Sequence, residues 1–312
     1  MTEFKNRVFG CVVVKAINSN YNADFSGQPR TLPSGVVYAT DKALKYTVKN
    51  YIKNVYPLER IFYFKSLNEN MNPISLNECY KKFFGDFPKK KAKDDTTKKE
   101  VARNLLSCLD IRLFGATFAG ETNISLHGPV QVNHGVNIWP ENNIYSEQIT
   151  SPFSNKADNK TDEKEMTTIG RQSKLEEGHY LHHFSVNPQN LRNMVALSGE
   201  GTQTLSLEDI EKLKEAMRRG VTWYDSASKA GCENEMLVWI QLKEESKAVF
   251  PNLTSLVELL TEKEDGKYVY DFSKLSNRLL SLKNDVETIE VYYSKESVLL
   301  KNIPEGTKER EL

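Results

Sequence analysis

The sequence predicts an α+β fold in which strands and helices follow the order β-α-β-β-α-β. Three observations support this prediction: an apolar, β-branched run at residues 8–16, an amphipathic helical pattern from residue 41, and a strand, a capped helix and a further strand within residues 179–243. Two segments of low apolar content, residues 68–100 and 151–178, interrupt this order. Without them the order is that of the ferredoxin-like topology.

The first half of the pattern begins with two apolar runs separated by a polar loop. Residues 8–16 (VFGCVVVKA) predict a central strand because they are mostly β-branched. The loop at residues 17–35 is rich in Asn, Gly and Pro, which favour turns of defined shape. Residues 60–67 (RIFYFKSL) predict the second strand.

An amphipathic helix is predicted to begin after Thr40, a suitable N-cap residue. Its apolar positions follow the spacing of one buried helix face: Leu44, Val48, Tyr51, Ile52 and Val55. Lysines at positions 42, 45, 49 and 53 share one stripe beside that face, and only Asp41 opposes them. Such a stripe is either a solvated helix face or a surface for phosphate groups.

The segment at residues 68–100 is lysine-rich and predicts an insertion of low order. The strand candidates at residues 144–150 and 179–186 flank the second polar segment, so we expect a long hairpin with residues 151–178 at its tip.

The later elements are marked by capping and by apolar runs. Ser206 and Asp209 form a predicted capping box at the start of a helix that ends at Gly220. Residues 235–243 predict a strand. Beyond residue 254 the pattern predicts two helices (SLVELL and FSKLSNRLLSL) and one strand (ETIEVYY).

Composition narrows the classes of function. Basic and acidic residues both total 42, so the formal net charge is zero, and a nucleic acid would have to meet a locally basic surface. The four cysteines have no metal-like spacing, which suits free thiols in a reducing cytoplasm. The sequence has no run of 18 apolar residues and no signal-peptide pattern, so we expect a cytoplasmic protein without a membrane span.

Signatures of catalysis are absent from the sequence. It has no Walker motif, complete dinucleotide fingerprint or Gly-x-Ser-x-Gly elbow, so we expect neither an enzyme nor a cofactor. His179, His182 and His183 have metal-ligand spacing only on a helix. On the predicted strand, His179 and His183 lie about 13 Å apart, too far for one ion. We therefore expect no metal site, and histidines that are structural or that stack at a nucleic-acid surface.

The ribbon at residues 124–140 (ISLHGPVQVNHGVNIWP) alternates like a strand but carries amides, one imidazole and glycines. A buried ribbon would have more apolar side chains, and a solvated one more Lys and Glu. Gln131, Asn133 and His134 therefore indicate a surface against which a flat polar partner lies. Gly128 and Gly135 would let the backbone approach that partner.

Segments of the sequence match, in order, those of one protein family: INSNYNADFSGQPR, TDKALKYTVKNYI, DIRLFGATFA, GPVQVNHGVNIWPEN, QITSPFSN, MTTIGRQSKLEEGHYLHHFSVNP, LEDIEKLKEAM and YDSAS. The chain resembles the DevR-type family of CRISPR interference proteins and is most similar to its subtype I-B branch. These proteins are the backbone subunits of type I Cascade, which coat the guide RNA (crRNA). The similarity covers most of residues 8–245.

The resemblance implies an architecture and a set of partners. An RNA-recognition-like palm would comprise residues 1–55, 101–144 and 181–312, with fingers at 56–100 and a thumb hairpin at 145–180. Copies of the chain would stack head to tail along one guide RNA, together with other Cascade subunits, and present the RNA for pairing with target DNA. Such a subunit has no membrane partner, no cofactor and no catalytic residues.

The resemblance also implies RNA-binding residues. Lys45 matches the phosphate-binding lysine of the family's first helix, and Lys42 and Lys49 lie on the same stripe. Arg112 would be a second backbone contact, unless it forms an ion pair with Asp110. The remaining candidates are Asn18 and Asn20 in the first loop, Gln131, Asn133 and His134 in the ribbon, and Met166, Thr168, Arg171 and Lys174 in the thumb, where Met166 or Ile169 would wedge between bases.

Departures and competing hypotheses remain. Many relatives carry a basic residue where this chain has Val136, and Asn137 is the nearest polar replacement. A second hypothesis is a magnesium-dependent endoribonuclease, because related type III subunits cleave target RNA with a thumb aspartate; here Asp158 and Asp162 occupy that insertion. A third hypothesis is an autoregulator that binds duplex DNA.

Overall fold

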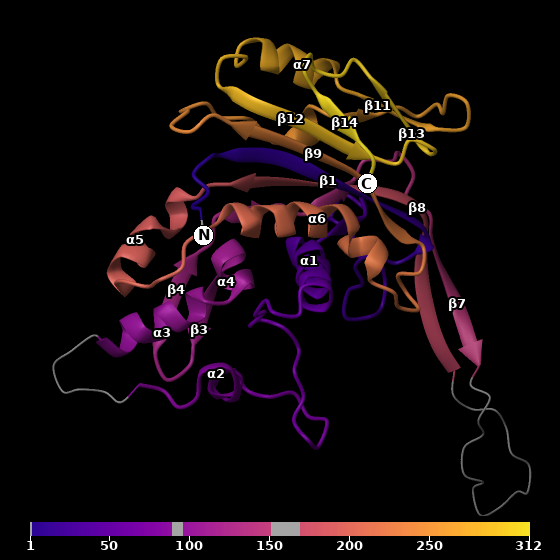
Figure 1. Cartoon of the computed structure of the whole chain (residues 1–312). Helices are drawn as coiled ribbons and strands as arrows, with labels where there is room; N and C mark the ends of the chain where they lie inside the picture. Colours follow the sequence, from indigo (N-terminus) through magenta and orange to yellow (C-terminus); the bar gives the residue numbers. More distant parts are fainter. Residues whose placement is uncertain (1, 89–95, 151–168) are drawn as a thin grey trace, which may run out of the picture.

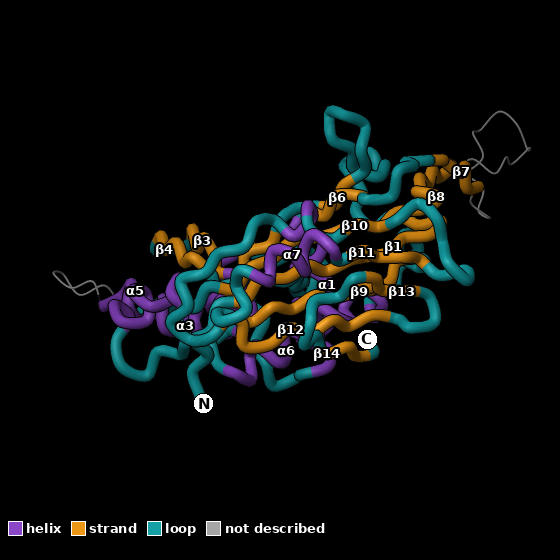
Figure 2. The backbone as a smooth tube through the Cα atoms, turned by 90° about the horizontal axis from the view of Figure 1, so that it is seen from above, coloured by secondary structure: helices purple, strands orange, loops and turns teal. Residues whose placement is uncertain are grey.

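The computed structural model describes residues 2–88, 96–150 and 169–312. In these residues the chain is an α+β fold, as predicted, built on a nine-stranded sheet (Figure 1). Helices cover one face of the sheet. A small three-stranded sheet with its own helix covers the other face (Figures 1 and 2).

The large sheet contains β1 (Val8–Ser19), β2 (Tyr38–Ala39), β5 (Val130–Val132), β6 (Gly135–Asn137), β7 (Ile144–Thr150), β8 (Ile169–Val186), β9 (Cys232–Leu242), β12 (Val286–Tyr293) and β14 (Lys308–Arg310). Their order is β14-β12-β9-β1-β8-β6-β2, and β5 and β7 also pair with β8. The pairs of β1 with β8 and β9 are antiparallel, as is that of β8 with β6. The strands predicted in VFGCVVVKA, EMLVWIQLK and ETIEVYY are confirmed as β1, β9 and β12.

The helices are α1 (Asp41–Val55), α2 (Leu76–Phe84), α3 (Thr96–Leu106), α4 (Leu109–Phe114), α5 (Gln189–Ser198), α6 (Leu207–Trp223) and α7 (Ser273–Leu280), with one 3-10 turn, η1 (Leu253–Ser255). The small sheet consists of β10 (Glu258–Leu259), β11 (Tyr268–Asp271) and β13 (Val298–Lys301), and β3 (Gly115–Ala119) pairs with β4 (Asn123–His127). The helices predicted from residue 41, from Ser206 and in FSKLSNRLLSL are confirmed as α1, α6 and α7. The Ser206–Asp209 capping box is present, and α6 continues three residues beyond Gly220, to Trp223.

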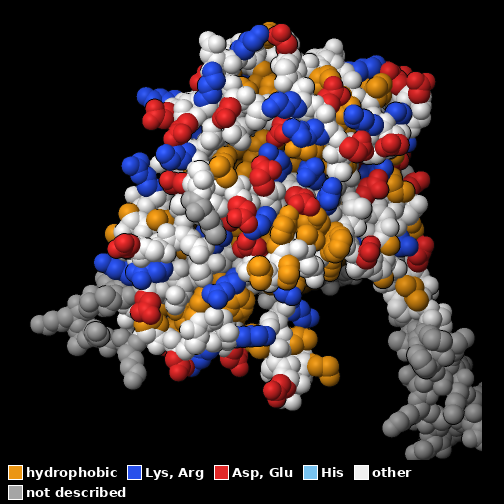
Figure 3. Space-filling view, in the orientation of Figure 1, with side chains coloured by type: hydrophobic (Ala, Val, Ile, Leu, Met, Phe, Trp, Pro, Cys, Tyr) orange, Lys and Arg blue, Asp and Glu red, His pale blue; other side chains and the backbone are white. Residues whose placement is uncertain are grey.

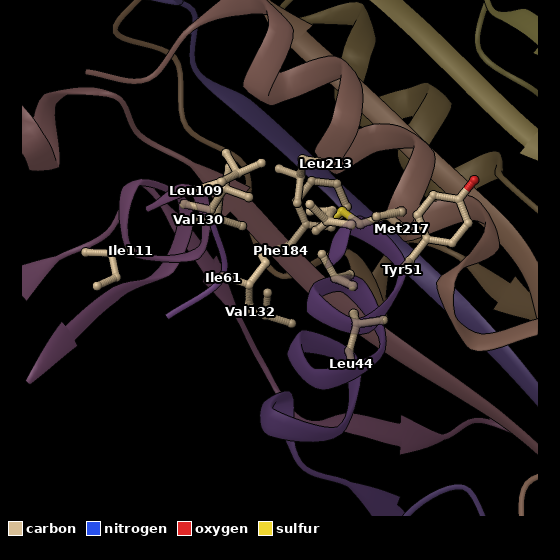
Figure 4. Close-up of a cluster of buried hydrophobic side chains, with 14 of the residues drawn as sticks. Leu44, Tyr51, Ile61, Leu109, Ile111, Val130, Val132, Phe184, Leu213 and Met217 are labelled. Carbon is tan, nitrogen blue, oxygen red and sulfur yellow. The ribbon is translucent and has the colours of Figure 1, made fainter. Parts of the chain in front are cut away.

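The central strand β1 is buried on both faces, which explains its continuous apolar sequence. Val12 and Val14 face the core under the helices, whereas Cys11 and Val13 face the core under the small sheet. Helices α1 and α6 pack together on the first of these cores (Figure 4). A Cβ atom on Gly220 would lie 2.9 Å from the Thr47 carbonyl oxygen, so the glycine permits this close crossing.

A long hairpin is present, formed by β7 and the first part of β8, from Ile144 opposite Leu175 to Thr150 opposite Ile169. Its predicted bounds are corrected, because residues 169–178 belong to strand β8 and not to the tip, and residues 179–186 pair with β1. The hairpin projects from the body of the molecule (Figure 1). The second part of β8 lies inside the sheet beside β1. One strand thus joins the hairpin rigidly to the sheet.

The prediction of a strand at residues 60–67 is wrong. The Phe62 and Tyr63 amides each donate a 2.8 Å hydrogen bond to the Asp110 carboxylate instead of to a neighbouring strand. The strand that follows α1 in the sheet therefore comes from the ribbon, as β5 and β6. Residues 68–88 are more regular than expected, because Ser75 and Glu78 form a capping box at the start of α2.

Two smaller predictions are also corrected. The segment SLVELL begins at Ser255, the last residue of η1, and contains β10 rather than a helix, because Glu258 and Leu259 pair with β11. Thr40 is the N-cap residue of α1, but its hydroxyl donates to Asn22 Oδ1 at 3.0 Å and does not cap the helix. None of the described helices is long and apolar enough to cross a lipid bilayer.

Candidate nucleic-acid interface

The first turn of α1 meets the ribbon through one carboxylate. Lys45 Nζ lies 2.9 Å from Asp41 Oδ2, and Asp41 Oδ1 lies 3.7 Å from His134 Nδ1. The Asp41 backbone amide also donates to His134 Nδ1 at 3.3 Å. Lys45 and His134, which are almost ninety positions apart in the sequence, therefore belong to one surface.

The other end of the ribbon is also close to Lys45. Lys45 Nζ lies 5.6 Å from the centroid of the Phe114 ring, and Gly128 packs directly against the Phe114 backbone. Gln131 Nε2 donates to the Gly128 carbonyl at 2.8 Å. Lys45, Asn133 and His134 thus gather around Asp41, and we call these three residues the ribbon–helix surface. Gln131 lies between Val130 and Val132, which pack in the core with α1, so its side chain points to the opposite face of the strand.

Burial raises the pKa of Asp41, but the hydrogen bond from Lys45 and the charges of Lys45, Lys42 and His134 outweigh it, so the pKa is lower than usual. The carboxylate remains ionised at neutral pH and offsets part of the Lys45 charge. In return it fixes the position of the Lys45 ammonium, whose side chain is only 20% exposed.

The predicted lysine stripe is divided between two surfaces. Lys49 Nζ donates to the Tyr63 carbonyl at 2.7 Å, and burial lowers its pKa. Lys49, the exposed Lys42, and Lys65 line a groove with the stacked rings of Tyr46 and Phe64. No acidic residue lines this lysine–aromatic groove among the described residues. Lys42 and Lys65 are exposed at this groove, and Lys42 lies 3.6 Å from Asp41, a residue outside the groove wall.

The structure corrects the prediction that Arg112 is a second contact to the RNA backbone. Its side chain is buried, and its guanidinium forms two hydrogen bonds with Asp209, at 2.9 and 3.1 Å. It also donates to the Leu106 carbonyl and to Gln203 Oε1. A buried guanidinium with these partners holds α4 against α6, so a direct contact with an RNA backbone is wrong for this conformation. The alternative partner, Asp110, is wrong as well, because Asp110 binds the Phe62 and Tyr63 amides.

The two loop asparagines brace the hairpin. Asn20 is buried and donates to the Gly27 and Ser173 carbonyls, both at 3.1 Å. Asn18 adopts a positive φ of 47° and accepts a hydrogen bond from the Tyr145 hydroxyl. The burial of Asn20 contradicts its predicted RNA contact, because both hydrogens of its amide group are already used within the protein.

The thumb candidates are only partly described. Arg171 is exposed on β8 opposite Gln148, and Lys174 Nζ lies 3.5 Å from Glu147 Oε2. Met166 and Thr168 lie outside the described residues, as do Asp158 and Asp162. The structure thus places two cations along the projecting hairpin.

The ribbon glycines serve the protein's own packing, contrary to the expectation that they admit a partner. A Cβ atom on Gly128 would lie 2.1 Å from the Phe114 carbonyl carbon, and one on Gly135 would lie 2.3 Å from His182 Nε2. His179 and His182 are fully buried, so they are structural. The described residues contain no cluster of three potential metal ligands.

Sequence reasoning missed the lysine–aromatic groove and the approach of Asn252 and Thr254 to the ribbon. Phe64 and Lys65 were predicted to lie in a strand, so the sequence did not indicate that they belong to a loop that lines the groove. Asn252 and Thr254 follow a proline in a polar turn, which indicates a turn but not its neighbour.

Residues 6–277 match the family model described as CRISPR-associated protein Cas7. The chain belongs to the Cas7 family. Two solved structures share the fold. One is titled "CRISPR RNA-guided surveillance complex, pre-nicking", with a TM-score of 0.57, 12% identity, and coverage of 98% of this chain and 96% of that chain.

The second is titled "CRISPR RNA-guided surveillance complex", with a TM-score of 0.52, 12% identity, and coverage of 97% of this chain and 94% of that chain. No curated protein sequence matches the chain. At this low identity the two structures establish a shared fold alone, over nearly the whole chain.

Proposed function

We propose that this Cas7 chain is a non-catalytic backbone subunit that binds guide RNA (crRNA) in a type I CRISPR interference complex. The observation that carries the proposal is the ribbon–helix surface, in which Lys45, Asn133 and His134 meet at Asp41, the first residue of α1. Both solved structures are named as RNA-guided complexes, which supports the proposal that this chain binds guide RNA.

The chemistry of this surface suits RNA of any sequence. Lys45 offers an ammonium group for phosphates and Asn133 an amide for a ribose hydroxyl group, and the neighbouring lysine–aromatic groove adds Lys42 and Lys49. The ribbon carries no arginine or lysine that could read a guanine edge bidentately. A guide RNA whose sequence varies must be held in this way, through its backbone.

We assign the palm, an RNA-recognition-like domain, to residues 1–55, 101–144 and 181–312. The order β9-β1-β8-β6, with α1 and α6 on one face, supports this assignment. Residues 56–100 would be the fingers and residues 145–180 the thumb. The projecting β7–β8 hairpin has the form expected of a thumb.

The assembly follows from the same proposal. Copies of this chain would stack head to tail along one guide RNA, contact other Cascade subunits, and present the RNA for pairing with target DNA in the cytoplasm. We place the chain in the DevR-type, subtype I-B branch on the strength of its sequence motifs. No described residue favours the endoribonuclease or autoregulator hypotheses.

The test is the binding of single-stranded RNA of scrambled sequence by a Lys42→Glu/Lys45→Glu variant. Because two phosphate contacts are reversed in charge, we expect the dissociation constant to rise at least about tenfold. The slope of log affinity against log salt should fall in magnitude by about 1.4. Fluorescence anisotropy at several salt concentrations measures both quantities.

A matched control changes the same charge on the opposite face of the sheet. Lys274 and Lys283 are exposed on and just after α7, each paired with one surface glutamate. A Lys274→Glu/Lys283→Glu variant should bind RNA as the wild type does. Equal losses in the two variants would show that only net charge matters, and would contradict a site on the ribbon–helix surface.

A further inference from the structure

A hollow of about 710 Å³ lies between the ribbon and the C-terminal part of the chain. Its walls come from three distant segments: Asp41 at the start of α1, Asn133 and His134 in the ribbon, and Asn252 and Thr254 in the η1 turn. We call it the ribbon–turn hollow. Its volume is in the range of pockets that hold one small ligand or nucleoside.

The η1 turn is fixed in place rather than merely adjacent. Leu253 is fully buried, and its amide donates to His183 Nδ1 on β8 at 3.4 Å. Asn252 Oδ1 accepts from the Thr254 amide at 3.0 Å and from the Thr254 hydroxyl at 2.8 Å. These two hydrogen bonds to Oδ1 fix the orientation of the Asn252 amide group and leave its Nδ2 atom available to donate to a ligand.

The polar atoms of the hollow are both donors and acceptors. His134 Nδ1 accepts a hydrogen bond from the Asp41 amide, which leaves Nε2 as the ring nitrogen that can donate to a ligand. Among the described residues, neither the Asn133 side chain nor Asn252 Nδ2 has a hydrogen-bond partner. The Asp41 carboxylate adds an acceptor at the wall nearest Lys45.

The lining fits a sugar better than a phosphate or a base. Within the described part of the chain, no lysine or arginine lines the hollow and His134 supplies its only ring, so these residues provide neither phosphate neutralisation nor an extended aromatic stack. Apolar contact comes from Val136 and Ile138. A ribose has one apolar face and a 2′-hydroxyl group that donates and accepts. Lys45, beyond Asp41, would hold the phosphate that follows it.

We propose that the ribbon–turn hollow binds a ribose of the RNA and distinguishes RNA from DNA through the 2′-hydroxyl group, with Asn252 and Thr254 as specificity-determining residues. This inference rests on the proposed RNA-binding function and assigns a role to the C-terminal part of the chain. In DNA the missing hydroxyl group would leave these polar atoms without a partner.

The test compares oligouridine with oligodeoxyuridine, which differ only in the 2′-hydroxyl group, by fluorescence anisotropy. We expect the wild type to bind oligouridine about tenfold more tightly, as one or two hydrogen bonds provide. Asn252→Asp keeps the oxygen that caps η1 but removes the Nδ2 donor. The ratio of the two dissociation constants should fall about threefold or more, whatever the added charge does to both strands.

Two further variants complete the design. Asn68→Asp is the matched control, because Asn68 Oδ1 also caps a turn, outside the hollow, by accepting from the Asn70 and Asn72 amides. Its ratio should equal that of the wild type. Thr254→Val, which preserves shape, should lower the ratio independently of any folding defect in Asn252→Asp.

An unchanged ratio in both Asn252→Asp and Thr254→Val would overturn the inference while leaving RNA binding intact. A wild-type protein that binds neither strand would instead overturn the proposed function, and the inference with it.

Discussion

Arg112 shows how the same residue type serves opposite roles depending on burial. The sequence surrounds Arg112 with apolar residues, which is compatible with a backbone contact or with an internal ion pair. The structure gives it Asp209, a residue that also completes the α6 capping box. One arginine therefore connects α4 to the start of α6, and its contribution is to folding.

Replacing Arg112 by Met should destabilise the fold by about 3–5 kcal/mol, because the Asp209 carboxylate would be left buried without its charge partner. Chemical denaturation followed by circular dichroism measures this change. The folded fraction of the variant should still bind RNA. A variant of unchanged stability that has lost RNA binding would restore the role predicted from the sequence.

His182 makes stability depend on pH. Burial lowers the pKa of His182 to about 4, while in the unfolded chain the pKa is about 6.5. The unfolded chain therefore binds more protons between these values, so the free energy of unfolding falls as pH decreases from about 6.5 to about 4. This difference in the pKa of His182 corresponds to a loss in the free energy of unfolding on the order of 3 kcal/mol.

A His182→Phe variant should lose this part of the pH dependence. Denaturation midpoints of both proteins are measured at several pH values between 4 and 7. The difference between the two curves isolates the contribution of His182, because the carboxylates titrate in both proteins. Identical pH profiles for the variant and the wild type would show that the pKa of His182 does not differ between the folded and unfolded states.

At the scale of elements, periodicity identified those that are buried on a regular face. The strands β1 and β9 and the helices α1 and α6 have long apolar patterns with matching propensities, so their local sequences decide their structures. The run at residues 60–67 has the same strand propensity, but Asp110, far along the chain, takes its amide hydrogens. No local pattern reveals such a partner.

The candidate site was predictable in part for the same reason. Helical spacing placed the lysines on one stripe, but only packing shows that Lys45 turns toward the ribbon while Lys49 turns toward Tyr63. The amides of the ribbon were visible as an anomaly in a strand. The neighbours of the ribbon, Asp41 and Asn252, could not be predicted, because their positions depend on tertiary contacts.

The β7–β8 hairpin permits a test of the thumb assignment. Glu147 and Gln172 are paired across the hairpin, so an Asn-Gly turn in place of residues 148–171 should close it without disturbing the sheet. We expect this variant to fold and to bind a short RNA. On a long RNA it should load fewer copies per strand, as measured by analytical ultracentrifugation.

Normal loading of copies on long RNA would contradict the assignment of this hairpin to contacts between neighbours. Loss of binding to short RNA as well would instead place its main contribution in the RNA site of its own subunit.

For the whole molecule, zero net charge conceals a local arrangement. Acidic and basic side chains are interspersed over the face shown in Figure 3. The candidate interface depends on how a few lysines are distributed, with the lysine–aromatic groove free of lining carboxylates and Lys45 held by Asp41. Net charge is therefore a poor guide to this Cas7 chain, whereas the side of the sheet on which cations lie is informative.

The central claim is that the ribbon and the first helix together hold the backbone of an unpaired RNA. Photo-cross-linking with RNA that carries 4-thiouridine at scattered positions, followed by mass spectrometry of the attached peptides, tests it most directly. The account predicts attachment within residues 41–55 and 128–138 whatever the RNA sequence. Attachment confined to α7, β11 and β13, on the opposite face of the sheet, would contradict it.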